Sequence, residues 1–430
     1  VISKVSQDIL VNKVVADVPD YSRLKLPFVT GTVENLSVLA TGQDAIFSLK
    51  SQSGSTLDVL ALGLSRLKTS QHEDRVLLVS FNGAVAGREK YTAPFFSGSG
   101  MAKRLDLPVL AFADPAITRD KSLSLGWYAG FEDYPQLTHD IATIVDWVAA
   151  HYNARLVVFG GSGGGFATLN MLSFIKAQAS AFIWNPQTSI SEYAPPLVEH
   201  YLKSAFPTAF FNTLTADAKM NNVFFRSVLD KVGITYDLTQ AVYSDNKQIL
   251  YIQNSSDHHV LNHAGPFMSH GGWGRQSDRV FTSPTKQTTL WFGLWGEGHA
   301  TPEADVIYNV LQQMVSQLPL AEIANYLDQK HNTLDAKFCA FSVDNVTPQI
   351  ELACCINDQR IAAVALTDID DFGLTYAFQL TDNRGNKYVN WYTPEPYRCF
   401  DVPDAFNEKL TMTVYVSDPL GVKFTKSVSL

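Results

Sequence analysis

The chain has 430 residues, of which 46% are hydrophobic and 17% are charged, a composition typical of a globular protein of two or three domains and unlike that of a disordered chain. The formal net charge is −9 and no run of Lys or Arg occurs, which argues against a nucleic-acid-binding protein. The sequence also lacks an unbroken apolar stretch of about 18 residues, the length that spans a membrane.

The first 75 residues favour β-strands, at residues 45–49 and 56–62. We expect these strands to form the antiparallel edge of the main sheet. Residues 1–35 would then be a strand-rich appendage to a larger domain that spans residues 36–325. The first residues lack the apolar core of a signal peptide, and we expect a cytoplasmic location.

From about residue 76 to residue 318, short apolar runs alternate with amphipathic helical patterns, which indicates a mostly parallel sheet covered by helices. Strands are expected at residues 76–80, 108–112, 155–159, 179–184, 248–253 and 289–292. Helices are expected at residues 134–151 and 166–176, and a last one with Thr301 as its N-cap. Residues 190–245 interrupt this alternation with helical pieces at 197–206 and 223–232, and such an insertion is a natural lid over a pocket.

Beyond residue 333 the pattern changes to strands separated by turns, which predicts a small all-β, sandwich-like module over residues 333–430. Its strands are expected at residues 337–343, 349–356, 375–380, 410–416 and 422–428. The cysteines lie in this last quarter of the chain and form no C-x-x-C pair, so we expect buried, reduced thiols; they are Cys339, Cys354, Cys355 and Cys399. If the chain has a macromolecular partner, this module is where it would bind.

Ser162 lies in the most informative motif, Gly160-Gly161-Ser162-Gly163-Gly164, which fits G-x-S-x-G. An apolar strand ends before it and a helix begins after it, which is the context of a nucleophilic serine on a sharp strand-to-helix turn. Such a turn can also bind phosphate, but the Walker form requires a Gly-Lys-Ser/Thr ending that is absent here. A dinucleotide-binding turn would need a glycine where Phe166 stands.

A nucleophilic serine requires a base, and the base requires an acid that orients it. Asp257 follows the expected strand at 248–253, and His299 stands between the last expected strand and the last helix. Both therefore lie where this fold carries its acid and base, in the chain order Ser, Asp, His. Glu297 is a weaker candidate for the acid.

Four neighbouring histidines leave a metal site as an alternative to the base-and-acid interpretation; they are His258, His259, His263 and His270. Adjacent histidines in an extended loop point in different directions, and no H-E-x-x-H helix accompanies them. We therefore expect no metal and no cofactor. His299 itself could instead be a buried hydrogen-bonding residue.

The oxyanion hole of such an enzyme would use the N–H of Gly163 and a second N–H from the loop after residue 80, where Asn82 and Gly83 are the candidates. An ordinary tight turn is the alternative for this loop. Trp127 and Tyr128, bracketed by glycines, are candidate substrate-binding residues in a pocket wall, or they pack their loop onto the core.

Over roughly residues 40–320 these motifs resemble the α/β-hydrolase superfamily. More narrowly, the series Asp-Pro, Gly-Trp-Tyr-x-Gly and Gly-x-Ser-x-Gly-Gly-Phe is similar to bacterial hydrolases related to accessory-secretion glycoprotein O-acetyltransferases. The resemblance implies a Ser162–Asp257–His299 triad that acts on acyl esters, including those of glycans. The module after residue 333 falls outside it.

The sequence thus predicts a serine hydrolase or acyltransferase whose substrate is a small-molecule or glycan acyl ester. Two alternatives stay open. The chain could be a non-catalytic glycan- or protein-binding protein on a hydrolase scaffold, although such a scaffold has no need of three matching residues. It could also be a serine peptidase, because enzymes with this fold and a lid also cleave amides.

Overall fold

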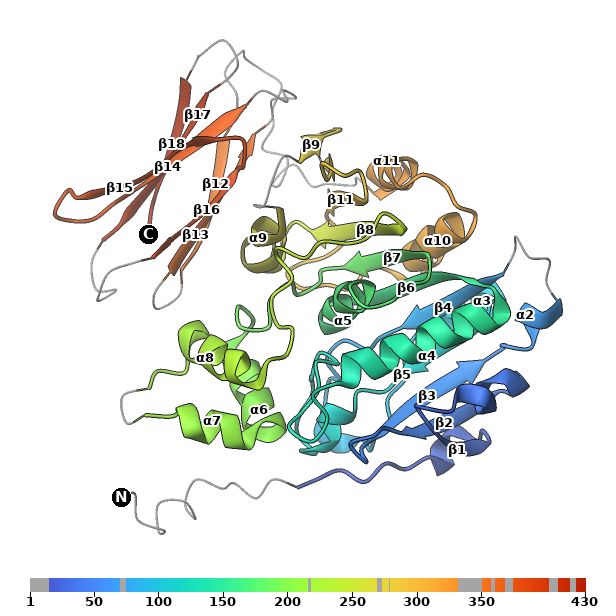
Figure 1. Cartoon of the computed structure of the whole chain (residues 1–430). Helices are drawn as coiled ribbons and strands as arrows, with labels where there is room; N and C mark the ends of the chain where they lie inside the picture. Colours follow the sequence, from blue (N-terminus) through green and yellow to red (C-terminus); the bar gives the residue numbers. More distant parts are fainter. Residues whose placement is uncertain are drawn as a thin grey trace. The chain divides into compact units, whose positions relative to one another are not determined.

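The computed structural model describes residues 15–69, 75–215, 218–268, 273–277, 279–331, 350–356, 360–367, 374–401, 409–417 and 423–430. Contacts within the chain divide it into two compact units, one made of Val1–Ala179 with Ile190–Tyr236 and the other of Ser180–Ser189 with Asp237–Leu430. The strands of the described residues include an eleven-stranded sheet in the order β1-β2-β3-β5-β4-β6-β7-β8-β11-β10-β9 (Figure 1). The expected mostly parallel sheet with helices is confirmed.

The first unit contains six strands of this sheet among its described residues. They are β1 (Phe28–Thr32), β2 (Ala45–Lys50), β3 (Thr56–Leu62), β4 (Val76–Ser80), β5 (Val109–Phe112) and β6 (Arg155–Gly161). β4 is parallel to β5 and β6, and its residues are all buried, as expected for a strand that is covered on both faces. β3 is antiparallel to β2 and β5, while β1 runs parallel to β2 at the edge. The predicted antiparallel edge is therefore present, and it carries one further strand.

Helices of the first unit cover this sheet and form the predicted insertion. They are α2 (Arg66–Thr69), α3 (Ser99–Leu105), α4 (Leu137–Tyr152), α5 (Gly163–Leu172), α6 (Pro195–Ala205), α7 (Pro207–Thr213) and α8 (Asn222–Val232), with the short turns η1 (Ser22–Leu24), η2 (Leu36–Thr41), η4 (Arg88–Lys90) and η5 (Pro115–Thr118). The apolar stripe of α4 is fully buried, as its spacing predicts. Three helices, α6 to α8, occupy the insertion expected at residues 190–245; its role as a lid stays a prediction.

The second unit contains the remaining strands of the large sheet. They are β7 (Ala179–Trp184), β8 (Lys247–Asn254), β9 (Gly274–Arg275), β10 (Val280–Thr282) and β11 (Thr288–Gly293), with η6 (Val260–Ala264), α9 (Gly265–Met268), α10 (Ala304–Val315) and α11 (Leu320–His331). β8 and β11 are parallel neighbours, so the loops that follow them leave the sheet at the same edge. The helix expected after residue 301 is α10, but the prediction that Thr301 is its N-cap is wrong. Glu303 is the N-cap of α10, because an extended conformation at residue 303 delays the first helical turn.

A β-sandwich forms the last part of the second unit and confirms the predicted all-β module. One sheet has the order β12-β13-β16 and the other β15-β14-β17-β18. Their bounds are β12 (Ile350–Ile356), β13 (Arg360–Thr367), β14 (Thr375–Thr381), β15 (Lys387–Thr393), β16 (Tyr397–Asp401), β17 (Thr411–Ser417) and β18 (Lys423–Ser429). Alternate residues of both sheets share one core, for example Ile361, Phe378 and Val414. The strand expected at residues 337–343 lies outside the described residues.

The cysteines of the sandwich are less buried than expected. Cys354 and Cys355 are half-buried and Cys399 is exposed, while Cys339 lies outside the described residues. Cys355 and Cys399 both pair with Ala362, one position from the core residue Ile361, and therefore lie on the outer face of their sheet. Every helix among the described residues is too short or too polar to cross a lipid bilayer.

Candidate active site

Ser162 stands on the sharp turn that its glycine-rich motif predicts. β6 ends at Gly161 and α5 begins at Gly163, and Ser162 between them has φ 54° and ψ −122°. A non-glycine residue rarely adopts a positive φ, and such strain is concentrated at functional sites. The carbonyl of Ser162 accepts the N–H groups of Gly165 (3.0 Å) and Phe166 (3.2 Å), so the serine caps the helix.

Two glycines on either side make this turn sterically possible. A Cβ atom on Gly160 would lie 2.5 Å from the carbonyl oxygen of Gly164, and one on Gly164 would lie 2.5 Å from the carbonyl oxygen of Phe81. Neither distance is compatible with a side chain. The motif therefore packs its backbone directly against the loop that follows β4.

That loop contains Asn82 and Gly83, the two residues predicted for the oxyanion hole, and their contacts differ. A Cβ atom on Gly83 would lie 3.1 Å from the carbonyl oxygen of Gly161 and 3.6 Å from Cβ of Ser162, so Gly83 is next to the serine. The N–H of Asn82 already donates to Oη of Tyr128 (2.9 Å), and its side chain donates to the Phe95 carbonyl (2.7 Å). Gly83 is consequently the better candidate of the two, together with Gly163 at the start of α5.

Trp127 and Tyr128 are buried, at 0% and 2% exposure. Tyr128 donates from Oη to the Phe112 carbonyl (2.9 Å), and Trp127 packs edge-on against Tyr201 with ring centroids 5.3 Å apart. Through these contacts both residues hold their loop on the core, the second of the two roles considered for them. Their contact with a substrate stays a prediction.

Asp114 is a site-supporting residue that sequence reasoning missed. It caps η5 and accepts the N–H groups of Tyr128 (2.8 Å) and Ala116 (3.0 Å), thereby fixing the loop whose tyrosine contacts Asn82. Burial raises its pKa to about 6, although the two backbone hydrogen bonds act in the opposite direction. The sequence signal was an Asp-Pro pair directly after a buried strand.

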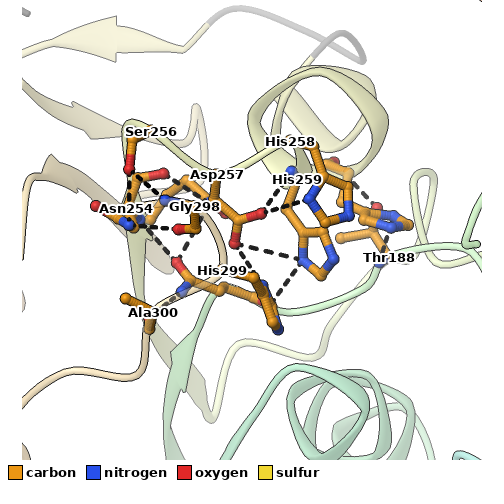
Figure 2. A network of polar contacts seen from close by, with 12 residues as sticks. Thr188, Asn254, Ser256, Asp257, His258, His259, Gly298, His299 and Ala300 are labelled. Carbon is orange, nitrogen blue, oxygen red and sulfur yellow. Dashed lines mark hydrogen bonds and ion pairs between the residues drawn. The ribbon is translucent and has the colours of Figure 1, made fainter. Parts of the chain in front are cut away.

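In the second unit, the structure brings together Asp257 and His299, the residues predicted as acid and base; their roles stay a prediction. Nδ1 of His299 lies 2.5 Å from Oδ2 of Asp257 (Figure 2). Asp257 follows β8 and its side chain is buried, whereas the side chain of His299, which follows β11, is 31% exposed. Glu297, the weaker candidate for the acid, is exposed to solvent.

Several donors keep the buried Asp257 carboxylate ionised. Burial alone would raise its pKa, but hydrogen bonds from His258 and His299 and from the backbone N–H of His259 outweigh it and lower the pKa well below the usual value. The carboxylate is thus a stable negative charge beside the His299 imidazole. Such a carboxylate fixes the tautomer of a histidine base and stabilises its protonated form.

His259 and His263 are buried beside this pair and are neutral. Desolvation lowers the pKa of His259 to about 3, and it lowers that of His263 well below the usual value. Nδ1 of His259 donates to the Asn185 carbonyl (2.9 Å), and Nδ1 of His263 accepts the N–H of Thr188 (3.3 Å). Both histidines therefore stabilise the fold through hydrogen bonds, while His270 lies outside the described residues.

A cation could also be held by this cluster, since Asp257, His259 and His299 present ligand atoms within 4.8 Å of one another. In the structure, Nδ1 of His299 is hydrogen-bonded to Asp257 and Nδ1 of His259 to the Asn185 carbonyl. The expectation of no metal stays a prediction.

No protein-family model and no curated protein matches the chain. Among solved structures, it is similar to a puromycin-hydrolysing peptidase of Mycobacterium tuberculosis, with 13% identity and a TM-score of 0.39 over 67% of this chain and 40% of that one. It is similar to an esterase of Pyrococcus furiosus, with 12% identity and a TM-score of 0.34 over 71% of this chain and 98% of that one. The PKD1 domain of Vibrio anguillarum Epp matches 20% of this chain and 94% of its own, with 14% identity and a TM-score of 0.16.

These likenesses are distant, and no substrate follows from them. The chain's own topology is that of an α/β-hydrolase fold, with a serine on the turn after a central parallel strand and an acid and a histidine after two later strands. The narrower similarity to glycoprotein O-acetyltransferases stays a prediction.

Replacing Gly164 by alanine should disrupt the serine turn, because the new Cβ would be forced against the Phe81 carbonyl. We expect the free energy of unfolding, measured with urea, to fall by about 1–3 kcal/mol. Gly100→Ala is the matched control, since a Cβ there meets nothing within 4 Å and alanine favours helix α3. Equal urea midpoints for Gly164→Ala and the wild type would contradict this steric account.

Replacing Asp114 by asparagine should alter how stability depends on pH. The pKa of Asp114 rises from 3.8 to about 6 on folding, so the folded chain binds the carboxyl proton more tightly than the unfolded chain does. Loss of this proton therefore destabilises the folded chain as pH rises from about 4 to above 6. Relative to the wild type, the variant should gain up to about 3 kcal/mol between pH 4 and pH 7. Urea unfolding at both pH values measures the gain, and a pH-independent difference between the two proteins would refute the expectation.

Proposed function

We propose that this chain is a serine hydrolase that cleaves acyl esters through an acyl-enzyme. The observation that supports this most strongly is the 2.5 Å contact between His299 and the buried Asp257, in a chain that also holds Ser162 at φ 54° on a strand-to-helix turn. A strained serine backbone costs free energy and is typical of functional sites, and a histidine base in such a catalyst is oriented by an acid. All three residues follow strands of the large sheet, in the order typical of this fold.

In the proposed reaction, His299 removes the proton from Oγ of Ser162 while the oxygen attacks the ester carbonyl carbon. The tetrahedral intermediate collapses, His299 gives its proton to the departing alcohol, and the acyl group stays on Ser162 as an ester. A water molecule, deprotonated by His299, then releases the acid and restores the serine. Asp257 stays ionised throughout and holds Nδ1–H of His299, so that the other ring nitrogen accepts the proton.

The negative charge that develops on the carbonyl oxygen would be stabilised by the N–H groups of Gly163 and Gly83. Gly163 opens α5, whose first N–H groups have no acceptor within the helix. Gly83 lies next to Ser162 in the adjoining loop. Two such donors, fixed before the reaction begins, typically lower the barrier by several kcal/mol.

The resemblance noted from the motifs extends the proposal to O-acyl groups of a glycan, with water or a sugar hydroxyl as the acceptor. Both acceptors use the same three residues, so hydrolysis and transfer differ only in what attacks the acyl-enzyme. Turnover of matched ester and amide substrates would separate this proposal from a peptidase.

Ser162→Ala should abolish acylation, because alanine has no nucleophile. We expect kcat with p-nitrophenyl acetate to fall by at least about 10³-fold, and labelling by a fluorophosphonate to disappear. Ser173→Ala is the control, since this exposed serine lies at the other end of α5. Intact-mass spectrometry of the labelled protein reports both results, and undiminished labelling of Ser162→Ala would discard the proposal.

A further inference from the structure

The loop that carries His299 has two hydrogen bonds of its own, from the Trp295 indole N–H to the Ala300 carbonyl (2.8 Å) and from the Ala300 N–H to the Gly298 carbonyl (2.9 Å). It runs from Trp295 to Ala300 and includes Gly296 and Gly298, the second with φ 61°. Glycine loses more conformational freedom on folding than other residues do. Hydrogen bonds from outside the loop therefore restrict the position of its histidine further.

Two backbone carbonyls on the N-terminal side of His299 receive such bonds from side chains outside the loop. The Asn254 amide donates to the carbonyls of Gly298 (2.6 Å) and Gly296 (3.0 Å). The Ser256 hydroxyl donates to the Gly296 carbonyl (2.7 Å) and accepts the N–H of Gly298 (3.0 Å). Figure 2 shows Asn254, Ser256 and Gly298 in one network beside Asp257 and His299. Together they clamp the residues on the N-terminal side of His299.

The residue on the other side of His299 is held in the same way. The Asn185 amide donates to the Ala300 carbonyl (2.7 Å), which also accepts the indole N–H of Trp295 (2.8 Å). Asn185 is 1% exposed and has φ 42°, a conformation that asparagine tolerates better than most residues. Its side-chain oxygen accepts the backbone N–H of Asn254 (2.7 Å), so Asn185 also fixes the backbone of Asn254.

These side chains lie at the ends of the strands that precede them. Asn254 is the last residue of β8, three positions before Asp257, and Asn185 directly follows β7. The same short segment thus provides the acid and the donors that hold the loop of the base. Hydrogen bonds between buried groups are strong and costly to leave unmade, so the two loops form one rigid unit.

We propose that Asn254, supported by Ser256 and Asn185, is a positioning residue that sets the distance between His299 and Asp257. This inference rests on the proposed function for its kinetic consequence. None of the three touches the reacting atoms: they hold the backbone of the loop residues around His299, and through it they act on the 2.5 Å contact between Nδ1 and the Asp257 carboxylate. A displacement of about 1 Å in such a group can cost about 10² in rate.

Asn254→Asp tests this inference, because it keeps the shape but replaces the two amide donors with an oxygen facing the Gly296 and Gly298 carbonyls. Ser256→Ala is a milder variant of the same clamp. We expect kcat to fall about 10²-fold for Asn254→Asp and about 10-fold for Ser256→Ala, with KM changed less than about twofold. KM should be spared because the substrate-binding groups are not altered.

Ser255→Ala is the matched control. Ser255 is half-buried like Ser256, and its hydroxyl also donates to a backbone carbonyl (2.9 Å), but the acceptor is Gly293 at the end of β11, before the His299 loop begins. It removes one hydrogen bond of the same kind from the neighbouring residue. We expect its kcat to stay within about twofold of the wild type, and a loss equal to that of Ser256→Ala would overturn the inference.

A readout independent of turnover is the ¹H NMR signal, far downfield, of the proton between His299 and Asp257. It should be present in the wild type and Ser255→Ala, and lost or shifted upfield in Asn254→Asp. If Asn254→Asp fails to fold, the downfield signal and the kcat of Ser256→Ala test the positioning role instead. Wild-type kcat and signal in the folded clamp variants would overturn the positioning role.

His299→Ala separates this inference from the proposed function. If that variant turns over esters like the wild type, the proposed function fails, and the NMR signal alone then tests the clamp. If His299→Ala is inactive while both clamp variants keep full kcat, only the positioning role is lost.

Discussion

The hydrogen bond between Nδ1 of His299 and the buried Asp257 carboxylate is the interaction on which the proposed chemistry depends. A carboxylate out of contact with water would ordinarily take up a proton, yet three donors around Asp257 keep it charged. That charge gives His299 a defined orientation and one defined protonated nitrogen. The pKa values of the neighbouring His259 and His263 are lowered by burial, so these side chains add hydrogen bonds to the cluster without adding positive charge.

A different constraint acts at the serine, and it is steric. Ser162 adopts a backbone conformation that few residues with a side chain adopt, and it does so because Gly160 and Gly164 let three stretches of backbone approach one another closely. The loop after β4 is one of these stretches, which brings Gly83 beside the serine. In the same loop, the N–H of Asn82 donates a hydrogen bond to Oη of Tyr128. Asp114 in turn holds this tyrosine by accepting its backbone N–H. A chain of buried hydrogen bonds thus occupies the N–H of Asn82 and leaves Gly83 as the proposed oxyanion-hole donor of this loop.

The two segments of the proposed site, the Ser162 turn and the His299 loop, have one feature in common. Each is a short, glycine-rich segment that contacts from neighbouring residues hold in position. The serine turn is held by close backbone packing, and the His299 loop by amide and hydroxyl donors from the ends of β7 and β8. The β-sandwich is built differently, by alternation of apolar residues from two sheets around a common core. Its separate architecture agrees with its position outside the hydrolase resemblance.

The sequence by itself determined the strand–serine–helix turn, the positions of Asp257 and His299 after late strands, and the change to an all-β pattern near the end, because glycine spacing and apolar periodicity are local properties. The edge strands β15 and β16 escaped this reasoning, since their pattern is weak until a partner strand covers one face, and the central, mostly apolar strand β13 was missed as well. Only the tertiary structure showed that His258 and the His259 backbone also contact Asp257, that the Asn82 N–H is bonded to Tyr128, and that Asn254 donates to the His299 loop. The contacts to the His299 loop depend on hydrogen bonds between residues about 40 positions apart, whose meeting is set by the register of β8 against β11 and has no counterpart in local sequence.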